Sequence, residues 1–397
     1  MEKNNSKKNY SWQMLSYLFI IQLFIAFSAR SIAPLGLKIG EALQLTMSQI
    51  GILPAALFLG QSLISMPAGI LTDRVGSKKM ILFIILGLSG SFFVLSFLSS
   101  FYLILLFILF SGCAYGASHP ATNQGVNEWF ETKKRGTAMG IKQMSVSLGS
   151  ALSALLLLPI ANQFGWRVTT LLTSFSLLII GIILCFFYKE RKNTIRFKRK
   201  KSINLLQLLT HKSLLFVTIS AMLLTGSQTI LNTFIVIFAY DQFQISLVLS
   251  GVLFGIAEFG GSLGRLSWGV ISDKIFLGKR VIVLLFISVL VAISSTIVSL
   301  LPSNTSFYLF AVIAFIFGFG TSGFHGVWMN ATSELAPPTN AGVATGASIT
   351  ISSWGAILFP PIFGFLLDTT GLYSIGWLYV TMLMIVSILM LLFVVKE

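Results

Sequence analysis

The chain has 397 residues, of which 55% are hydrophobic and only 10% are charged, and its mean hydropathy is +0.89. Soluble domains carry about 25% charged residues, so this composition excludes a soluble globular protein and indicates a membrane protein. A net charge of +15 is compatible with nucleic-acid binding. The basic residues, however, are concentrated in loops between apolar stretches, as in a membrane protein. Both cysteines lie within apolar stretches, which excludes a disulfide framework.

Twelve apolar stretches have the length of a transmembrane helix, which needs about 20 residues. In chain order they are 13–37, 48–70, 79–98, 101–123, 138–160, 167–188, 214–238, 246–270, 281–301, 306–329, 342–366 and 373–394. The loops between them are short, except for a stretch rich in Lys and Arg in the middle of the chain. We therefore predict an all-α integral membrane protein with an N-terminal six-helix bundle (1–188), a basic cytoplasmic linker (189–212) and a C-terminal six-helix bundle (213–397).

One pattern occurs in both predicted bundles. The first copy comprises Gly112, Gly116, His119, Glu128, Gly136 and Gly140. The second copy lies 206 positions later and comprises Gly318, Ser322, His325, Glu334, Gly342 and Gly346. This duplication predicts two pseudo-symmetric halves, which in transporters rock about a site between them.

The distribution of Lys and Arg predicts the orientation, because basic residues stay on the cytoplasmic side of a membrane. With the N-terminus inside, 22 of the 27 Lys and Arg residues lie in cytoplasmic segments, and the outer loops hold only Lys38 and Arg167. Arg30, Lys142 and Arg265 fall within spans, and Lys142 is interpreted as a cation at the cytoplasmic edge. We predict a multi-pass protein of the plasma membrane with both termini in the cytoplasm, whose basic excess also attracts anionic lipid.

The loop after the second stretch carries a recognisable motif. Residues 69–79 read Gly-Ile-Leu-Thr-Asp-Arg-Val-Gly-Ser-Lys-Lys, which resembles the loop motif of the major facilitator superfamily, G-x-L-x-D-R-x-G-[RK]-[RK]. The matching positions include Gly69, Asp73, Arg74, Gly76 and Lys78. The resemblance implies the twelve-helix fold of that superfamily, with alternating access between two bundles.

A degenerate copy of the motif follows the eighth stretch, where Gly269 and Asp273 repeat the glycine and the aspartate. The resemblance implies that both loops gate the cytoplasmic side. Arg135, in the neighbouring loop, is a candidate charge partner of Asp73, and Gly69 is expected to permit close helix approach. The alternative is that these charges only enforce the topology.

Two arginines inside predicted spans indicate the chemistry of a substrate. Arg30 lies one turn before Pro34 in the first span, and Arg265 lies in the eighth. Guanidinium groups bind carboxylate or nitrate bidentately, so the two residues predict an anion. The segment around Arg265 is similar to that of the oxalate/formate and monocarboxylate branches of the superfamily, which implies the same. The chain as a whole resembles the organic-anion branches, which include nitrate/cyanate-like members. The alternative for Arg265 is that its side chain reaches the inner surface.

Glu258, two turns before Arg265, either neutralises that arginine or carries a coupling proton. His119 and His325 are candidate proton carriers or, alternatively, packing residues. The predicted substrate-binding residues are Arg30, Arg265, Glu258, Asn232, Gln143 and Trp354.

These features predict a monomeric secondary active transporter that works by alternating access and takes up a small organic or inorganic anion by proton symport. The alternatives are a proton-coupled drug or metabolite efflux pump and a transporter-like receptor or lipid flippase. Efflux is disfavoured because residues 145–150 lack the proline of the antiporter pattern. The sequence holds no phosphate-binding Gly-Lys-Ser/Thr loop and no metal-ligand spacing of Cys and His, so we predict no enzyme activity, no cofactor and no metal.

Overall fold

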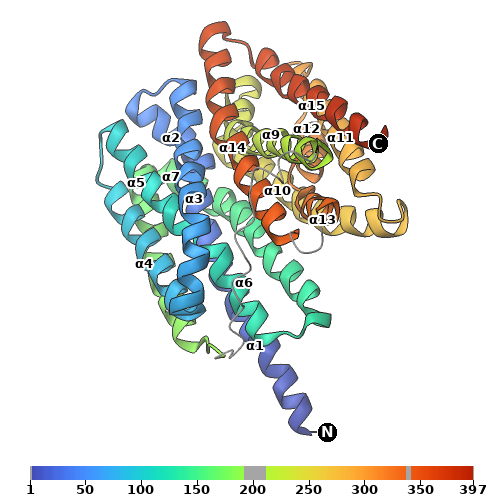
Figure 1. Cartoon of the computed structure of the whole chain (residues 1–397). Helices are drawn as coiled ribbons and strands as arrows, with labels where there is room; N and C mark the ends of the chain where they lie inside the picture. Colours follow the sequence, from blue (N-terminus) through green and yellow to red (C-terminus); the bar gives the residue numbers. More distant parts are fainter. Residues whose placement is uncertain (1, 192–211, 337–340, 397) are drawn as a thin grey trace. The chain divides into compact units, whose positions relative to one another are not determined.

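The computed structural model describes residues 2–191, 212–336 and 341–396, and all regular elements among them are α-helices (Figure 1). The helices are α1 (Glu2–Arg30), α2 (Ile32–Leu43), α3 (Met47–Val75), α4 (Ser77–Leu95), α5 (Phe101–Gly116), α6 (Ser118–Trp129), α7 (Thr132–Phe187), α9 (Lys212–Phe243), α10 (Leu247–Lys274), α11 (Arg280–Ser299), α12 (Phe307–Thr321), α13 (His325–Leu335), α14 (Ala341–Thr370) and α15 (Tyr373–Lys396).

The chain forms two compact units. The first comprises Met1–Ile39 and Ala56–Lys198, and the second comprises Gly40–Ala55 and Arg199–Glu397. The start of α3 therefore belongs to the second unit and its remainder to the first. Most of the predicted linker, residues 192–211, lies outside the described residues. The borders predicted at residues 188 and 213 stay a prediction.

Eleven helical stretches in the described part of the chain are long and apolar enough to cross a membrane. They correspond to the twelve predicted spans because one of them, Thr137–Phe187, has 51 residues, about twice the length that a bilayer requires. Gly165 interrupts its helical backbone with φ 79° and ψ 162°, a conformation that suits glycine, between the stretches predicted at 138–160 and 167–188. The predicted all-α fold of a multi-pass membrane protein is confirmed.

The same helix pairs pack in both units, as the sequence repeat predicts. In the first unit α7 packs on α1 and α4, and the Ser174 hydroxyl donates to the Ser89 carbonyl (2.7 Å). In the second unit α14 packs on α9 and α15 packs on α11, where the hydroxyls of Ser288 and Ser387 are 3.0 Å apart. Small residues and hydroxyls at these interfaces let helices associate in lipid, where no hydrophobic force draws them together.

Gly112 and Gly318, equivalent in the repeat, permit close contact between helices. A Cβ on Gly112 would overlap the Leu57 carbonyl of α3, and one on Gly318 would overlap the Ala257 carbonyl of α10. The expectation that Gly69 permits close helix approach is wrong for this structure, because a Cβ added at Gly69 would make an ordinary 3.9 Å contact with the Pro120 side chain. Its glycine is not required by packing within the first unit.

Replacing Gly112 by Ala should therefore destabilise the protein by about 1–3 kcal/mol, because the added methyl group meets backbone that cannot move aside. Gly140→Ala is the matched control, since nothing lies within 4 Å of a Cβ at Gly140. Thermal unfolding of the two variants in detergent measures the difference. Equal melting temperatures would contradict the packing described for Gly112.

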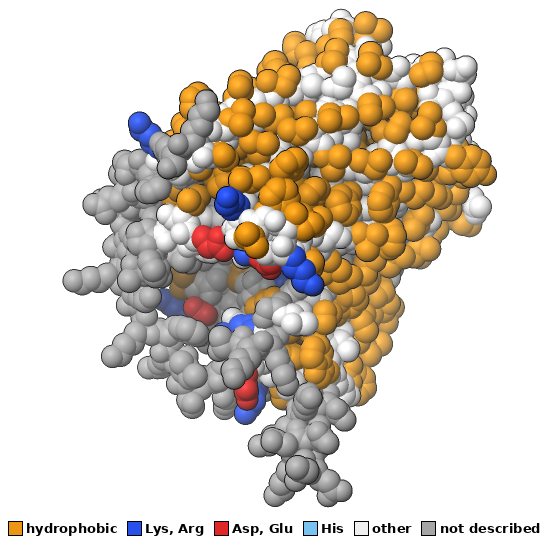
Figure 2. Space-filling model, turned by 90° about the vertical axis from the view of Figure 1, so that its right-hand side faces the viewer, with side chains coloured by type: hydrophobic (Ala, Val, Ile, Leu, Met, Phe, Trp, Pro, Cys, Tyr) orange, Lys and Arg blue, Asp and Glu red, His pale blue; other side chains and the backbone are white. Residues whose placement is uncertain are grey.

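Hydrophobic side chains cover a broad area of the face shown in Figure 2, and the Lys, Arg, Asp and Glu side chains of that view gather towards one end. Leu63 and Phe186 are examples of large apolar side chains that are more than half exposed, at 59% and 76%. Apolar exposure on this scale is unfavourable in water and is expected where a surface contacts lipid.

Candidate functional site

Arg30 ends α1 at a break in the first span. Pro34 has no N–H, so the α-helical hydrogen bond to the Arg30 carbonyl cannot form, and the chain turns at Ser31 before α2 begins. The half-buried Arg30 side chain donates from Nε to the Tyr115 hydroxyl (3.3 Å), and its guanidinium carbon lies 6.0 Å from the centre of the Phe58 ring. The break thus places a cation at membrane depth inside the first unit.

His119, in the first turn of α6, lies beside the same tyrosine. The centres of the His119 and Tyr115 rings are 6.0 Å apart, and the His119 side chain is half-buried. Tyr115 of α5 is fully buried and contacts both Arg30 of α1 and His119 of α6. The sequence named both ionisable residues but missed the tyrosine between them.

The interpretation of Lys142 as a cation at the cytoplasmic edge is wrong. Its side chain, on α7, is only 1% exposed, and Nζ donates to Thr122 Oγ1 (3.1 Å) and Asn123 Oδ1 (2.6 Å). Gln143 follows it on α7 and is half-buried. The side chain lies in the interior, where α6 supplies both of these polar partners.

Glu258 is a buried acidic residue of the second unit. Its side chain, on α10, is 1% exposed, and Oε1 accepts a hydrogen bond from Asn232 Nδ2 of α9 (2.5 Å). Oε2 is buried without a hydrogen-bond partner in the described structure. Glu258 and Asn232, each predicted to bind substrate, therefore lie together, and the second carboxylate oxygen is left without a partner among the described residues.

Arg265 belongs to a polar cluster around Ser322. Its half-buried side chain donates from Nε to the Ser322 carbonyl (3.0 Å), and His325 Nδ1 lies 3.3 Å from the same oxygen. Gln228 of α9 donates to the Ser322 hydroxyl (2.8 Å). Trp354, predicted to bind substrate, is 45% exposed on α14. The cluster joins α9, α10 and the α12–α13 connection, so Arg265 and His325 share a partner.

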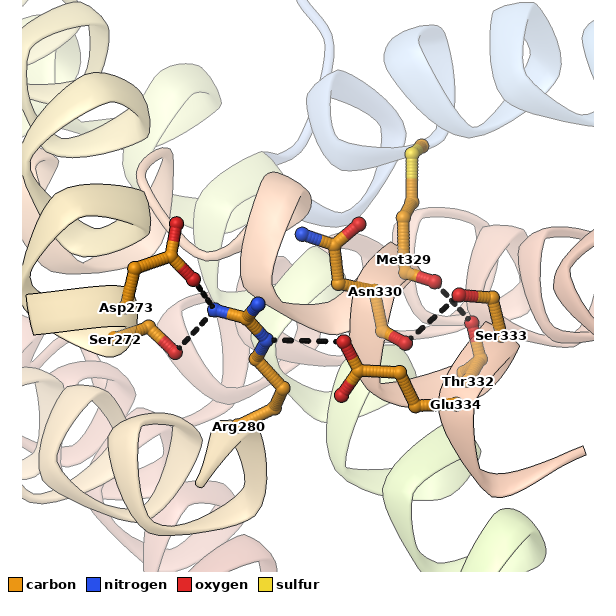
Figure 3. A network of polar contacts seen from close by, with 8 residues as sticks. All are labelled: Ser272, Asp273, Arg280, Met329, Asn330, Thr332, Ser333 and Glu334. Atoms are coloured by element: carbon orange, nitrogen blue, oxygen red, sulfur yellow. Dashed lines mark hydrogen bonds and ion pairs between the residues drawn. The ribbon is translucent and has the colours of Figure 1, made fainter. Parts of the chain in front are cut away.

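Figure 3 shows the polar network at the loop between α10 and α11. Arg280, at the start of α11, lies between Asp273 and Glu334, with Nη1 2.5 Å from Asp273 Oδ1 and Nε 3.3 Å from Glu334 Oε1. The same Nη1 donates to the Ser272 hydroxyl (2.8 Å). Asp273 of the degenerate motif thus ties α10 to α11 and, through Arg280, to α13, whereas Gly269 has open space around it.

The loop of the first unit is built differently, around Gly76 and Glu190. Gly76 has φ +91°, and a Cβ there would overlap the Glu190 carboxylate, which accepts the Ser77 N–H at the start of α4 (2.9 Å). Lys78 donates to the carbonyls of Phe186 and Tyr188 at the end of α7. The Tyr188 hydroxyl lies 3.5 Å from the Ser77 hydroxyl. Gly76 and Lys78 therefore join α4 to the end of α7.

Arg135 is not the charge partner of Asp73 in this structure. Its Nη2 donates to the carbonyls of Asn127 and Phe130 at the end of α6, where a cation suits the helix dipole. Asp73 and Arg74 are exposed, and the structure gives Asp73 no ion pair with a described residue. The gating role of these residues stays a prediction.

Sequence reasoning missed several polar residues that the structure brings into play. Gln22 is fully buried on α1 and bonded to Thr122 (3.1 Å); its spacing of 206 from Gln228 would have indicated it. Asp368, at the end of α14, accepts the backbone N–H groups of Met47 (2.7 Å) and Ser48 (2.8 Å) and so caps α3. No local pattern links Asp368 with α3, because the two segments are far apart in sequence.

Comparison with known proteins identifies the family to which this architecture belongs. The family model described as Major Facilitator Superfamily matches residues 18–347 and 276–397. A relative described as a probable nitrate transporter, from Staphylococcus epidermidis, is 24% identical and aligns with 99% of this chain and 98% of its own. The hexuronate transporter of Bacillus subtilis is 22% identical over 85% of this chain and 83% of its own.

Among solved structures, a bacterial homolog of the human lysosomal transporter Spinster, in an inward-facing and occupied conformation, superposes with a TM-score of 0.79. It is 16% identical and covers 98% of this chain and 97% of its own, so the likeness concerns the fold. The family match extends over almost the whole chain, from residue 18 to residue 397. The chain belongs to the major facilitator superfamily of membrane transporters.

Proposed function

We propose that this transporter takes up a small organic or inorganic anion together with a proton, working by alternating access. The observation that carries the proposal is the presence of an arginine within a membrane span of each unit, Arg30 and Arg265. Charges at membrane depth cost a few kcal/mol each on insertion scales and mark substrate pathways. Nitrate and hexuronates, the substrates named for two relatives, are anions that a guanidinium binds bidentately.

Glu258 is our candidate for the proton carrier. A buried carboxylate is costly unless all its oxygens are satisfied, and Glu258 Oε2 has no hydrogen-bond partner in the described structure. Binding a proton removes the buried charge while the hydrogen bond from Asn232 to Oε1 is kept. His119 and His325 stay candidates for a second proton site, since both are half-buried near the arginines of their own units.

The orientation is part of the proposal. The excess of basic residues in the segments predicted to be cytoplasmic supports an orientation with both termini inside and the loop after α3 on the cytoplasmic face of a bacterial plasma membrane. A cysteine introduced in place of exposed Lys79 and one in place of exposed Tyr102 should label from opposite sides of the membrane.

Counterflow in proteoliposomes tests the substrate class. Vesicles loaded with nitrate, glucuronate, lactate or cyanate should each be tested for uptake of the same labelled anion, and cationic dyes should be tested in parallel. We expect exchange of at least one anion and no exchange of the dyes. Exchange of dyes alone would favour the efflux pump, and no exchange with any compound would favour the receptor or flippase.

Asp73→Asn should slow transport and leave the equilibrium affinity for the anion unchanged, because Asp73 is exposed in the last turn of α3, outside the polar clusters of both units. Asp273→Asn is the comparison, since it also removes the ion pair with Arg280. The initial rate of counterflow and the anion-dependent thermal shift of each variant separate the two effects. A weakened affinity in Asp73→Asn would contradict the gating role.

A further inference from the structure

Lys142 is a buried cation whose described partners are all uncharged. Its side chain is 1% exposed within a membrane span, and its ammonium donates to a threonine hydroxyl and an asparagine amide oxygen. No carboxylate among the described residues lies within ion-pair distance of Nζ. Removing one partner from a buried ion pair strongly destabilises a protein, because the remaining charge is buried without compensation. Lys142 resembles such a remaining charge.

The partners of Lys142 belong to a chain of neutral groups. Thr122 Oγ1 lies 3.1 Å from Gln22 Oε1 and accepts from Lys142, while Gln22 Nε2 lies 3.5 Å from the Ser118 hydroxyl. Thr122 and Asn123 of α6 orient the ammonium and Gln22 of α1 bonds to Thr122, but none of these groups carries a charge to balance it. The first unit therefore holds the cation in place without neutralising it.

The sequence repeat shows that the fold itself does not need this charge. Ser348 lies 206 positions after Lys142, and Trp328 lies 206 positions after Thr122. In the second unit Trp328 Nε1 donates to the Ser348 hydroxyl (2.9 Å), which also lies 2.9 Å from the Thr218 hydroxyl. The same two positions are thus joined in both units, by an uncharged pair in one and by a lysine in the other.

We propose that Lys142 is a ligand of the transported anion in the first unit. The inference rests on the proposed function, because a negatively charged substrate would supply the balance that the described protein groups do not. The ligand class is a carboxylate or a small oxyanion, whose oxygens accept the ammonium N–H groups. Asn123 is half-buried and its Oδ1 accepts an ammonium N–H at 2.6 Å, and an oxygen of the anion would take the place of this acceptor.

A ligand and a structural cation differ in what their loss does to the empty protein. Lys142→Ser copies the residue that the repeat places at Ser348. If Lys142 serves binding, this variant removes an unbalanced buried charge and should melt, without anion, at or above the temperature of the wild type. If Lys142 serves only to hold α6 on α7, the same variant should melt at a lower temperature.

The experiment uses the full chain in lipid nanodiscs, with nitrate and glucuronate as probes and thermal unfolding as the readout of binding. We expect Lys142→Ser to raise the Kd of the anion that stabilises the wild type roughly ten- to a hundredfold. Lys142→Arg, which keeps the charge, should retain more affinity than Lys142→Ser. Exposed Lys79→Ser, which changes the net charge equally, should bind as the wild type does.

The outcomes distinguish the two proposals. If the wild type is stabilised by an anion and Lys142→Ser binds it equally well, the inference is overturned and the proposed function stands. The inference is also overturned if Lys142→Arg and Lys142→Ser lose affinity equally and both melt at lower temperatures without anion. If no anion among the probes stabilises the wild type, the proposed function fails, and the role of Lys142 fails with it.

Discussion

Replacing Arg30 or Arg265 by Lys is expected to weaken anion binding roughly ten- to a hundredfold, although the charge is kept. The reason is geometric, because an ammonium is a point charge and cannot reproduce the planar fork that a guanidinium offers to a carboxylate or nitrate. Loss of one charge-assisted hydrogen bond costs about 1.5–3 kcal/mol, which corresponds to that change in Kd. The measurement is the anion-dependent thermal shift of each purified variant.

Arg167 provides the matched control for these variants. It lies two residues after Gly165, which interrupts α7, and its Nη2 donates to the Leu98 carbonyl (3.1 Å) and the Ser99 hydroxyl (3.0 Å). Arg167→Lys should lower stability slightly and leave the Kd of the anion unchanged. Affinity equal to that of the wild type in both Arg30→Lys and Arg265→Lys would assign structural roles to the two arginines and reopen the substrate class.

The sequence predicted the fold well because lipid imposes a simple rule. Backbone groups in a membrane must be paired within their own helix, so each long apolar stretch indicates one span. The repeat predicted two similar halves, and its glycines Gly112 and Gly318 each make a close helix contact in their own unit. The rule does not locate a break inside a continuous apolar stretch, and the signal in the sequence for the turn at Ser31 between α1 and α2 is Pro34.

The polar partners were harder to predict, because they depend on which helix faces which. Arg30 and Glu258 were identified from their charge, but Tyr115 and Ser322, which contact Arg30 and Arg265, carry no charge to mark them. Lys142 was misplaced because its position near the start of a span is typical of a cytoplasmic cation. The side chain turns inwards because Thr122 and Asn123 receive it.

Replacing Glu258 by Gln is expected to abolish anion accumulation driven by a proton gradient and to retain anion counterflow. Glutamine cannot take up the proton, but its amide oxygen can still accept the hydrogen bond that Asn232 donates to Glu258 (2.5 Å). Exchange of anion without net proton movement therefore continues. Uptake into proteoliposomes, measured with and without an imposed pH gradient, separates the two activities.

Glu334→Gln is the control for Glu258→Gln, because Glu334 is an exposed acid of the same unit whose partner is Arg280. It should keep accumulation driven by the gradient, and its loss of a partly exposed ion pair should change stability by no more than about 1 kcal/mol. Accumulation by Glu258→Gln at the wild-type level would show that another group carries the proton, and the half-buried His119 and His325 would be tested next.

Coupling of anion uptake to a proton gradient is tested directly by uptake of a labelled anion into proteoliposomes whose exterior is more acidic than the lumen. We expect nitrate or a carboxylate to accumulate in the lumen above its external concentration, and a protonophore to abolish the accumulation. Equal uptake with and without the gradient, or accumulation of cationic dyes in place of anions, would contradict this expectation.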